Sequence, residues 1–464
     1  MVAEGGFAGV FDGPNWKIFN MIAVTGFRVG GFMMGDGSII VISDCHLGLV
    51  SGGRTKGVVC EPDKLGQFLS WLIRLERGEK FTVALGPWGG GRSEKVLKAP
   101  EKVILLGDIV ELWDAADREV DQCSRPIFDL LGRMRCEKIY VLGNHDYDLK
   151  SLVGTYPSGE QTLKIVEECY PEQVEDGRVV TLEKGDRGYL FVHGYQFDKI
   201  FRFHPWKLLP GVRSGAIAFG KYGDVFVALL VISVLAWLLD YFAAHQAALG
   251  ATALIQTLLL VGFPAQLAAL SLLSLSGYWA TLHPVLSVLG NSALILLWAI
   301  LGGPRIVYLY GRRVWSRLVG TRYNREASIR GLRSWWRRFS RGRAVDAKNL
   351  RVVYGHTHLI DMIPPEELAA DIGVNVTALN IPAWVKDYTE KHRQKLRAAC
   401  LYIDDEDELF IGWDWNERRP FLIPVEAVYE RRKNGKISEG TAEKLLSIGW
   451  PKSMVDTWLK VKIT

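Results

Sequence analysis

Short apolar runs alternate with polar clusters along much of this chain. Five of the runs are three or four residues long, at positions 39–42, 103–106, 139–142, 190–192 and 352–354. Such runs are typical of strands that are buried on both faces. An aspartate, an asparagine or a histidine follows each run within two residues. The pattern therefore predicts a mixed α/β fold in which these polar side chains lie in loops at strand ends.

The polar clusters contain the residue types that bind metal ions. They are Asp44-Cys45-His46, Gly107-Asp108, Gly143-Asn144-His145-Asp146, His193-Gly194 and Gly355-His356-Thr357-His358. Carboxylate, imidazole and amide groups suit Mn²⁺, Fe or Zn²⁺, and one carboxylate, such as that of Asp108, can bridge two ions. A single buried histidine is more often a core residue, but five of the nine histidines fall in these clusters. We therefore expect a site for two metal ions.

In their order and in their residue types, the clusters resemble the D-x-H, G-D, G-N-H-D/E, H and G-H-x-H motifs of the calcineurin-like metallophosphoesterase superfamily. The resemblance implies an α/β (α+β) fold, a calcineurin-like two-sheet β-sandwich flanked by helices. It implies one metal bound by Asp44, His46, Asp108 and His358, and a second bound by Asp108, Asn144, His193 and His356. It also implies that His145 stabilises the transition state or protonates the leaving group, with Asp146 orienting it. A hydroxide that bridges the two metals would attack the phosphorus.

A narrower resemblance follows Asp108. The segment from Gly107 to Asp114 is similar to the G-D-x-x-E-x-W segment of the UDP-2,3-diacylglucosamine hydrolase branch, which is membrane-associated and cleaves a pyrophosphate on a lipid-linked nucleotide sugar. That branch usually has arginine after its metal-binding asparagine, whereas this chain has His145. The departure leaves the exact substrate open.

A long apolar stretch predicts an inserted transmembrane helical region. Residues 225–302 contain one acidic residue, Asp240, and neither lysine nor arginine. This composition favours a membrane-embedded segment over its alternative, an apolar soluble hairpin or dimer interface. The stretch lies between His193 and His356, which are expected at the same metal, so it must cross the membrane an even number of times. Two spans with an extra piece fit its length best.

Basic residues on both sides of the stretch predict its orientation. They are Lys207, Arg213 and Lys221 before it, and Arg305, Arg312, Arg313 and Arg317 after it. Such flanking charges favour a catalytic domain on the cytoplasmic side of the cell membrane. The six cysteines have no C-x-x-C spacing, which favours reduced thiols and agrees with that location. No secretory signal is expected at the start of the chain.

A basic segment follows the apolar stretch. Between residues 305 and 343 there are twelve arginines and one acidic residue, Glu326, together with Trp315, Trp335 and Trp336. We expect a basic juxtamembrane helix on anionic lipid headgroups, with the tryptophans at headgroup level. Nucleic acid is the alternative partner, but the position beside the apolar stretch favours lipid.

Together these features predict a membrane-bound metallophosphoesterase whose most favoured substrate is lipid-linked. Its expected parts are residues 1–222 and 311–464, which form the phosphoesterase domain, and 223–310, which form the membrane insertion. We expect Mn²⁺ as the metal, with Fe, Zn²⁺ or Mg²⁺ as alternatives, and substrate contacts from Arg54, Lys207 and Arg213. A membrane-tethered phosphatase, phosphodiesterase or nucleotide-sugar pyrophosphatase that acts on soluble substrates is the alternative. A catalytically silent scaffold is disfavoured because all seven ligands are present. The sequence does not indicate an oligomeric state.

A hairpin is also expected from residues 401–403 and 409–413, followed by a mostly helical segment at 426–459.

Overall fold

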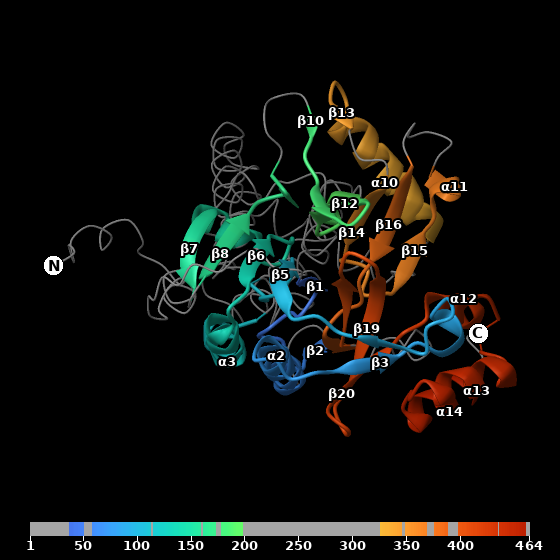
Figure 1. The fold of residues 1–464 in the computed structure, drawn as a ribbon. Helices are drawn as coiled ribbons and strands as arrows, with labels where there is room; N and C mark the ends of the chain where they lie inside the picture. Colours follow the sequence, from blue (N-terminus) through green and yellow to red (C-terminus); the bar gives the residue numbers. More distant parts are fainter. Residues whose placement is uncertain are drawn as a thin grey trace, which may run out of the picture. The chain divides into compact units, whose positions relative to one another are not determined.

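The structure is a computed structural model, and the described residues all belong to one unit of the chain, Met1–Phe203 together with Tyr323–Thr464. The described ranges are 37–50, 58–112, 115–158, 161–172, 178–197, 325–345, 349–368, 375–387, 398–434 and 436–460. Figure 1 shows their helices and strands.

The first sheet has eight strands in the order β20-β19-β18-β1-β5-β6-β8-β7. Its strands are β1 (Ser38–Ile42), β5 (Pro100–Leu106), β6 (Glu137–Val141), β7 (Gly154–Ser158), β8 (Gln161–Val166), β18 (Ala399–Ile403), β19 (Glu408–Asp414) and β20 (Arg419–Leu422). The central strands β1, β5, β6 and β8 are parallel. Their carboxyl ends therefore lie at one edge of the sheet.

The second sheet has six strands, of which five follow the order β11-β12-β14-β16-β15 and the sixth, β9, pairs with β12. Its strands are β9 (Cys169–Tyr170), β11 (Leu182–Lys184), β12 (Arg187–Val192), β14 (Leu350–Tyr354), β15 (Asp361–Ile363) and β16 (Val376–Asn380). Strands β12, β14 and β16 are parallel, although β12 and β14 are far apart in the sequence.

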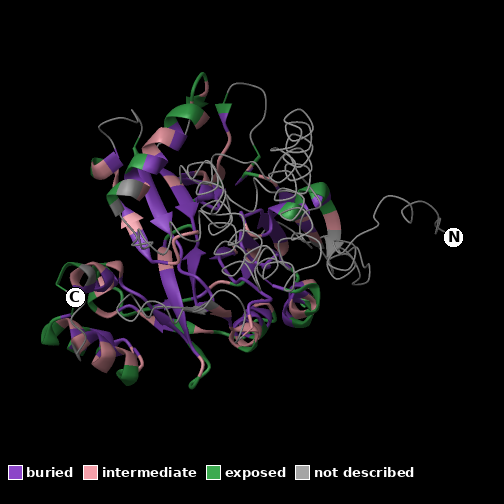
Figure 2. Cartoon of the chain, turned by 180° about the vertical axis from the view of Figure 1, so that it is seen from behind, coloured by how far each residue is buried: buried purple, intermediate pink, exposed green. Residues whose placement is uncertain are grey.

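Side chains of the second sheet alternate between two apolar clusters, as expected for strands buried on both faces. Phe191 and Val353 belong to the cluster that contains the first sheet. Their neighbours Val192 and Val352 belong to a second cluster, which helix α10 (Arg325–Phe339) completes. In Figure 2 the strands of both sheets are buried almost throughout. The two sheets thus pack face to face, and α10 covers the outer face of the second.

Helices α2 (Pro62–Glu76) and α3 (Asp117–Arg133) pack side by side against the first sheet (Figure 1). Helix α2 begins with proline, which suits the first helical position. Its buried residues Leu65, Phe68, Leu69 and Leu72 recur at helical spacing and form one apolar face.

Smaller elements surround these layers. The strand pairs are β2 (Val58–Cys60) with β17 (Val385–Asp387), β3 (Thr82–Ala84) with β4 (Glu94–Val96), and β10 (Arg178–Val179) with β13 (Ala344–Val345). The short helices are η1 (Gly86–Trp88), η2 (Tyr147–Leu152), η3 (Tyr195–Phe197) and α11 (Pro365–Leu368). The chain continues into α12 (Val425–Asn434), α13 (Glu439–Ser447) and α14 (Lys452–Lys460). The hairpin and the helical segment expected near the end of the sequence are therefore confirmed.

The mixed α/β fold with two sheets agrees with the sequence prediction, whereas the apolar stretch at 225–302 lies outside the described residues. In the described ranges, no helix combines the length and the apolar character needed to cross a bilayer. The expected boundaries near 222 and 310 also lie outside these ranges and stay predictions.

The prediction for the tryptophans of the basic segment is wrong for the two that are described. Trp335 and Trp336 are 9% and 1% exposed and pack in the cluster between α10 and the second sheet. Trp315 lies outside the described residues. An amphipathic helix can place its apolar face on a sheet or on lipid, and periodicity alone does not distinguish the two.

Candidate metal centre

The seven predicted ligands lie at the carboxyl ends of parallel strands from both sheets. Asp44, Asp108 and Asn144 follow β1, β5 and β6, and His193 and His356 follow β12 and β14. Backbone hydrogen bonds join the loops within each sheet: Asp44 N donates to Gly107 O at 3.0 Å, and Gly355 N donates to His193 O at 2.9 Å. The sheets are joined by His356 N, which donates to Asp44 Oδ2 at 2.9 Å.

Five of the seven ligands have left-handed backbone conformations. Their φ angles are 53° for Asp44, 44° for His46, 51° for Asp108, 68° for His356 and 61° for His358. A non-glycine residue held in this region costs of order 1–3 kcal/mol and persists only where the surrounding structure enforces it. Such strain is typical of functional sites.

Steric constraints explain why glycine occupies positions 107, 143 and 355 of the motifs. A Cβ atom at Gly143 would lie 2.2 Å from Asp108 Oδ1, and one at Gly355 would lie 2.0 Å from Ser43 Oγ. A Cβ atom at Gly107 would lie 2.3 Å from His193 Nδ1. Any side chain at these positions would displace the predicted ligands.

Asp44, His46 and His358 form the first candidate ligand group. The Nε2 atoms of His46 and His358 lie 3.3 Å apart, and His358 Nε2 lies 3.4 Å from Asp44 Oδ1. Lone pairs that converge in this way suit a shared cation.

Asp108, His193 and His356 form the second candidate group. His193 Nδ1 donates to the carbonyl oxygen of Leu106 at 2.9 Å, so Nε2, which lies 3.2 Å from Asp108 Oδ2, is the ring nitrogen that could bind a metal. Asn144 is buried beside this group, and neither of its side-chain polar atoms has a hydrogen-bond partner. A buried amide with no partner is costly unless something else binds it.

The electrostatics of the site favour cations. Burial opposes ionisation of Asp108, but His193 and His145 hold its pKa well below the ordinary value. Burial also opposes protonation of His193, yet Asp108 raises its pKa to about 10, so a cation that binds Nε2 would displace a proton from it. Burial and the charge of His193 lower the pKa of His356 to about 3, so this imidazole is neutral and can bind a metal. The ionised carboxylates and the free amide therefore fit two divalent cations.

His145 lies beside this centre, and its ring is held by Glu111, a residue that the sequence analysis did not select. His145 Nδ1 lies 2.8 Å from Glu111 Oε1, and His46 Nδ1 lies 2.9 Å from Glu111 Oε2. Glu111 is fully buried. An ionised carboxylate can only accept hydrogen bonds, so both Nδ1 atoms donate and both Nε2 atoms face away from Glu111. Its signal in the sequence was its place as the glutamate of the G-D-x-x-E-x-W segment, three residues after Asp108.

The predicted role of Asp146 needs correction. Its carboxylate accepts hydrogen bonds from Gly143 N at 2.6 Å, Ile109 N at 2.9 Å and the hydroxyl of Tyr140 at 2.6 Å. Asp146 therefore fixes the loops that carry the ligands, while Glu111 orients the ring of His145. The predicted substrate contacts, Arg54, Lys207 and Arg213, lie outside the described residues.

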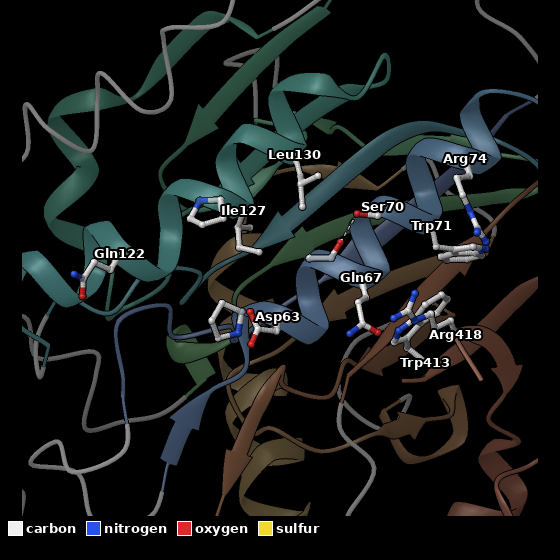
Figure 3. A pocket seen from close by; sticks show the side chains of 13 residues that line it. Asp63, Gln67, Ser70, Trp71, Arg74, Gln122, Ile127, Leu130, Trp413 and Arg418 are labelled. Carbon is white, nitrogen blue, oxygen red and sulfur yellow. Dashed lines mark hydrogen bonds between the residues drawn. The ribbon is translucent and has the colours of Figure 1, made fainter. Parts of the chain in front are cut away.

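A separate cavity of about 600 Å³ lies on the outer side of the first sheet. Figure 3 shows it between α2 and α3, with Trp71, Ile127, Leu130, Trp413 and Arg418 among its lining residues. None of the seven predicted ligands lines it.

Comparisons with known proteins support a phosphoesterase. Residues 37–214 match the family model of the calcineurin-like phosphoesterases. A solved structure of a dimetal phosphatase from Danio rerio is 12% identical, with a TM-score of 0.28 and coverage of 81% of this chain and 95% of that chain. A search of curated proteins found no match. The matched segment, residues 37–214, contains five of the seven predicted ligands, and it supports a hydrolase of phosphoester bonds that is similar to the calcineurin-like phosphoesterases.

Proposed function

We propose that this protein is a membrane-bound, two-metal phosphoesterase that hydrolyses a phosphate or pyrophosphate bond of a lipid-linked substrate. The observation that carries the two-metal part is the pair of ligand groups, Asp44 with His46 and His358, and Asp108 with His193 and His356. The buried amide of Asn144, which follows the neighbouring strand β6, has no hydrogen-bond partner among the described residues. Asp44, His46, Asp108 and His358 would bind one ion, and Asp108, Asn144, His193 and His356 the other. When bound, two divalent cations would lower the pKa of a water and stabilise charge on the phosphoryl oxygens.

The protein groups around the metals supply orientation and a proton. Glu111 accepts from Nδ1 of His145 and of His46, which keeps a proton on Nδ1 of both rings and turns Nε2 away from the carboxylate. Nε2 of His46 is then available for a metal. Protonated His145 would donate from Nε2 to the leaving oxygen, because Nδ1 is held by Glu111. Asp146 keeps the loop in place through Gly143 N.

Two features support a lipid-linked substrate. The apolar stretch at 225–302 is inserted between His193 and His356, which belong to one ligand group. A simple anchor would work equally well at a terminus, so this placement favours a substrate that arrives through the bilayer. Helix α10 also carries exposed arginines at positions 330, 337 and 338, and Arg341 is exposed just after the helix; these side chains suit anionic headgroups.

We test the substrate by replacing residues 225–302 with a short soluble linker. Turnover of p-nitrophenyl phosphate with Mn²⁺ should remain near that of the unmodified chain, and turnover of a lipid-linked diphosphate in mixed micelles should fall strongly. Metal content and melting temperature control for folding, and Asp108→Ala serves as the inactive control. Undiminished lipid turnover would contradict substrate capture by the insertion. An unmodified, metal-loaded chain that hydrolyses none of the phosphates offered would contradict the enzymatic proposal itself.

The basic flanks of the stretch further support a catalytic domain on the cytoplasmic side. Single cysteines introduced near both ends of the chain should react with a membrane-impermeant reagent only when the cytoplasmic side is opened. Labelling of the two ends on opposite sides would refute an even number of crossings.

A further inference from the structure

Two cysteines lie in contact near the loop that carries the predicted ligands Asp44 and His46. Cys60 is the last residue of β2, and Cys123 lies in α3. Their sulphur atoms are 3.7 Å apart, although 63 residues separate them in the sequence. The two residues are 6% and 7% exposed, so each is nearly but not completely buried. The other four cysteines are also buried, and none of them forms a disulfide.

This pair is closely connected to the loop from His46 to Leu49. Cys60 N donates to Leu49 O at 2.8 Å, and Leu49 N donates to His46 O at 3.1 Å. Gly48, between them, has a φ of +120°, and a Cβ atom there would lie 2.8 Å from Val120 Cγ2 on α3. Two hydrogen bonds thus lead from Cys60 to the predicted ligand His46, and α3 packs tightly against the loop between them.

The two thiols are chemically unequal. The hydrogen bond from Cys60 lowers the pKa of Cys123 to about 7, and the backbone of Gly48 acts in the same direction. The same thiol–thiol hydrogen bond and burial raise the pKa of Cys60. Cys123 therefore has the character of the attacking thiolate and Cys60 that of the resolving thiol.

We propose that Cys60 and Cys123 form a redox-sensitive dithiol whose oxidation to a disulfide lowers the activity of the neighbouring metal centre. A hydroperoxide is the oxidant. The Cys123 thiolate attacks one peroxide oxygen, the O–O bond breaks, and a sulfenic acid forms while the other oxygen leaves as water or alcohol. The Cys60 sulphur then attacks the sulfenic sulphur, and a water leaves as the disulfide forms. A dithiol reductant reverses the change.

The geometry explains why the disulfide should affect catalysis. A disulfide holds its sulphurs about 2.05 Å apart, so Cys60 and Cys123 must approach each other from 3.7 Å. Because Cys60 is bonded to Leu49, this approach pulls β2 and α3 against the loop of His46. A disturbance that misorients a metal ligand typically costs roughly 10–100-fold in metal affinity or activity.

The test uses the purified full-length protein, treated with hydrogen peroxide that is then removed by catalase. Non-reducing peptide mapping should identify a Cys60–Cys123 crosslink, and the intact mass should decrease by two hydrogens. Turnover of p-nitrophenyl phosphate should fall roughly tenfold and return after dithiothreitol treatment. The Cys60→Ser and Cys123→Ser variants should resist this inactivation. The Cys136→Ser variant, which lacks another buried thiol, should remain as sensitive as the unmodified chain.

Two results would overturn the proposal. One is the absence of a Cys60–Cys123 crosslink after peroxide treatment. The other is equal peroxide inactivation of the Cys60→Ser variant, which would assign the loss to the metals or to another side chain. The peptide map does not depend on turnover, so failure of the dithiol and failure of the enzymatic function can be distinguished.

Discussion

The carboxylate of Glu111 accepts a hydrogen bond from the imidazole of His145. The distance from Nδ1 to Oε1 is 2.8 Å, and Glu111 is fully buried. The same carboxylate contacts Nδ1 of His46 at 2.9 Å. One side chain therefore orients both a predicted metal ligand and the predicted proton donor. Burial opposes its ionisation, but His145 and His46 hold the pKa of Glu111 below its ordinary value.

The first prediction concerns this pair. Glu111→Gln keeps the side-chain volume, but its amide has one acceptor oxygen and cannot accept from both Nδ1–H groups. We therefore expect the turnover rate and the metal affinity each to fall roughly 10–100-fold. His145→Ala should instead keep its metals and lose roughly 10²–10⁴-fold in kcat. Metal analysis and steady-state kinetics measure both effects, with the exposed Glu366→Gln as a control. A Glu111→Gln variant with normal kcat and normal metal content would refute the role of the carboxylate.

The second prediction concerns Asn144, whose buried amide has no hydrogen-bond partner among the described residues. Asn144→Ala removes an uncompensated polar group, so the melting temperature of the metal-free protein should stay the same or rise. The increase in melting temperature on adding Mn²⁺ should become smaller, because less binding free energy stabilises the folded state.

Scanning calorimetry with and without metal measures both changes for Asn144→Ala. Asn349→Ala, which removes a surface contact to Asp186, should leave the metal-dependent increase intact. A large loss of stability in the metal-free Asn144→Ala protein would show that the amide has a structural partner instead.

The extent to which sequence predicted this site can be traced to particular residues. The strands before Asp44, Asp108, Asn144, His193 and His356 are all observed, because short apolar runs bounded by polar residues define buried strands locally. Because these strands are parallel within each sheet, their carboxyl ends lie on the same side of that sheet, and the polar residues that follow them come together. The ligand roles themselves stay predictions.

Contacts between distant loops could not be predicted in this way. Glu111 meets His145 across 34 residues and His46 across 65. Whether its side chain points into the centre depends on the path of the loop after β5, which no periodicity encodes. The same limit explains why Asp146 was assigned to the ring of His145 although it binds the backbone of Gly143.

The third prediction concerns the pH dependence of stability at a buried ion cluster. Lys95 Nζ lies 2.8 Å from Asp404 Oδ2, 2.7 Å from Asp407 Oδ2 and 3.0 Å from Glu406 Oε2, and joins β4 to the turn between β18 and β19. Burial opposes ionisation of the two aspartates, but hydrogen bonds from Lys95 hold the pKa of Asp404 below its ordinary value. For Asp407, hydrogen bonds from Arg92 and Lys95 do the same.

A lowered aspartate pKa stabilises the folded state above the unfolded pKa of about 3.9, and this stabilisation is lost as the pH falls through the folded pKa. Lys95→Met should therefore cost about 3 kcal/mol of unfolding free energy near pH 7, and the deficit should shrink below about pH 4. Lys98→Met breaks a more exposed pair with Asp405 and should cost less than about 1 kcal/mol. Denaturant titrations at several pH values measure the difference from the unmodified chain. A deficit for Lys95→Met that does not change with pH would contradict the assignment.

The last prediction separates the two faces of α10. Trp336 is 1% exposed in the cluster with the second sheet, so Trp336→Ala should cost about 3–5 kcal/mol in unfolding free energy. Arg330, Arg337 and Arg338 are exposed on the same helix. Their combined replacement by alanine should leave the melting temperature nearly unchanged, because exposed charges contribute little to stability.

If this face meets anionic headgroups, each arginine contributes about 1 kcal/mol of attraction to the membrane surface. The full-length protein in mixed micelles should then turn over a lipid-linked substrate faster as the anionic lipid fraction rises, and the triple variant should lose that dependence. Added salt should weaken the effect in the unmodified chain. An identical response of the triple variant to anionic lipid would show that α10 serves only to cover the second sheet.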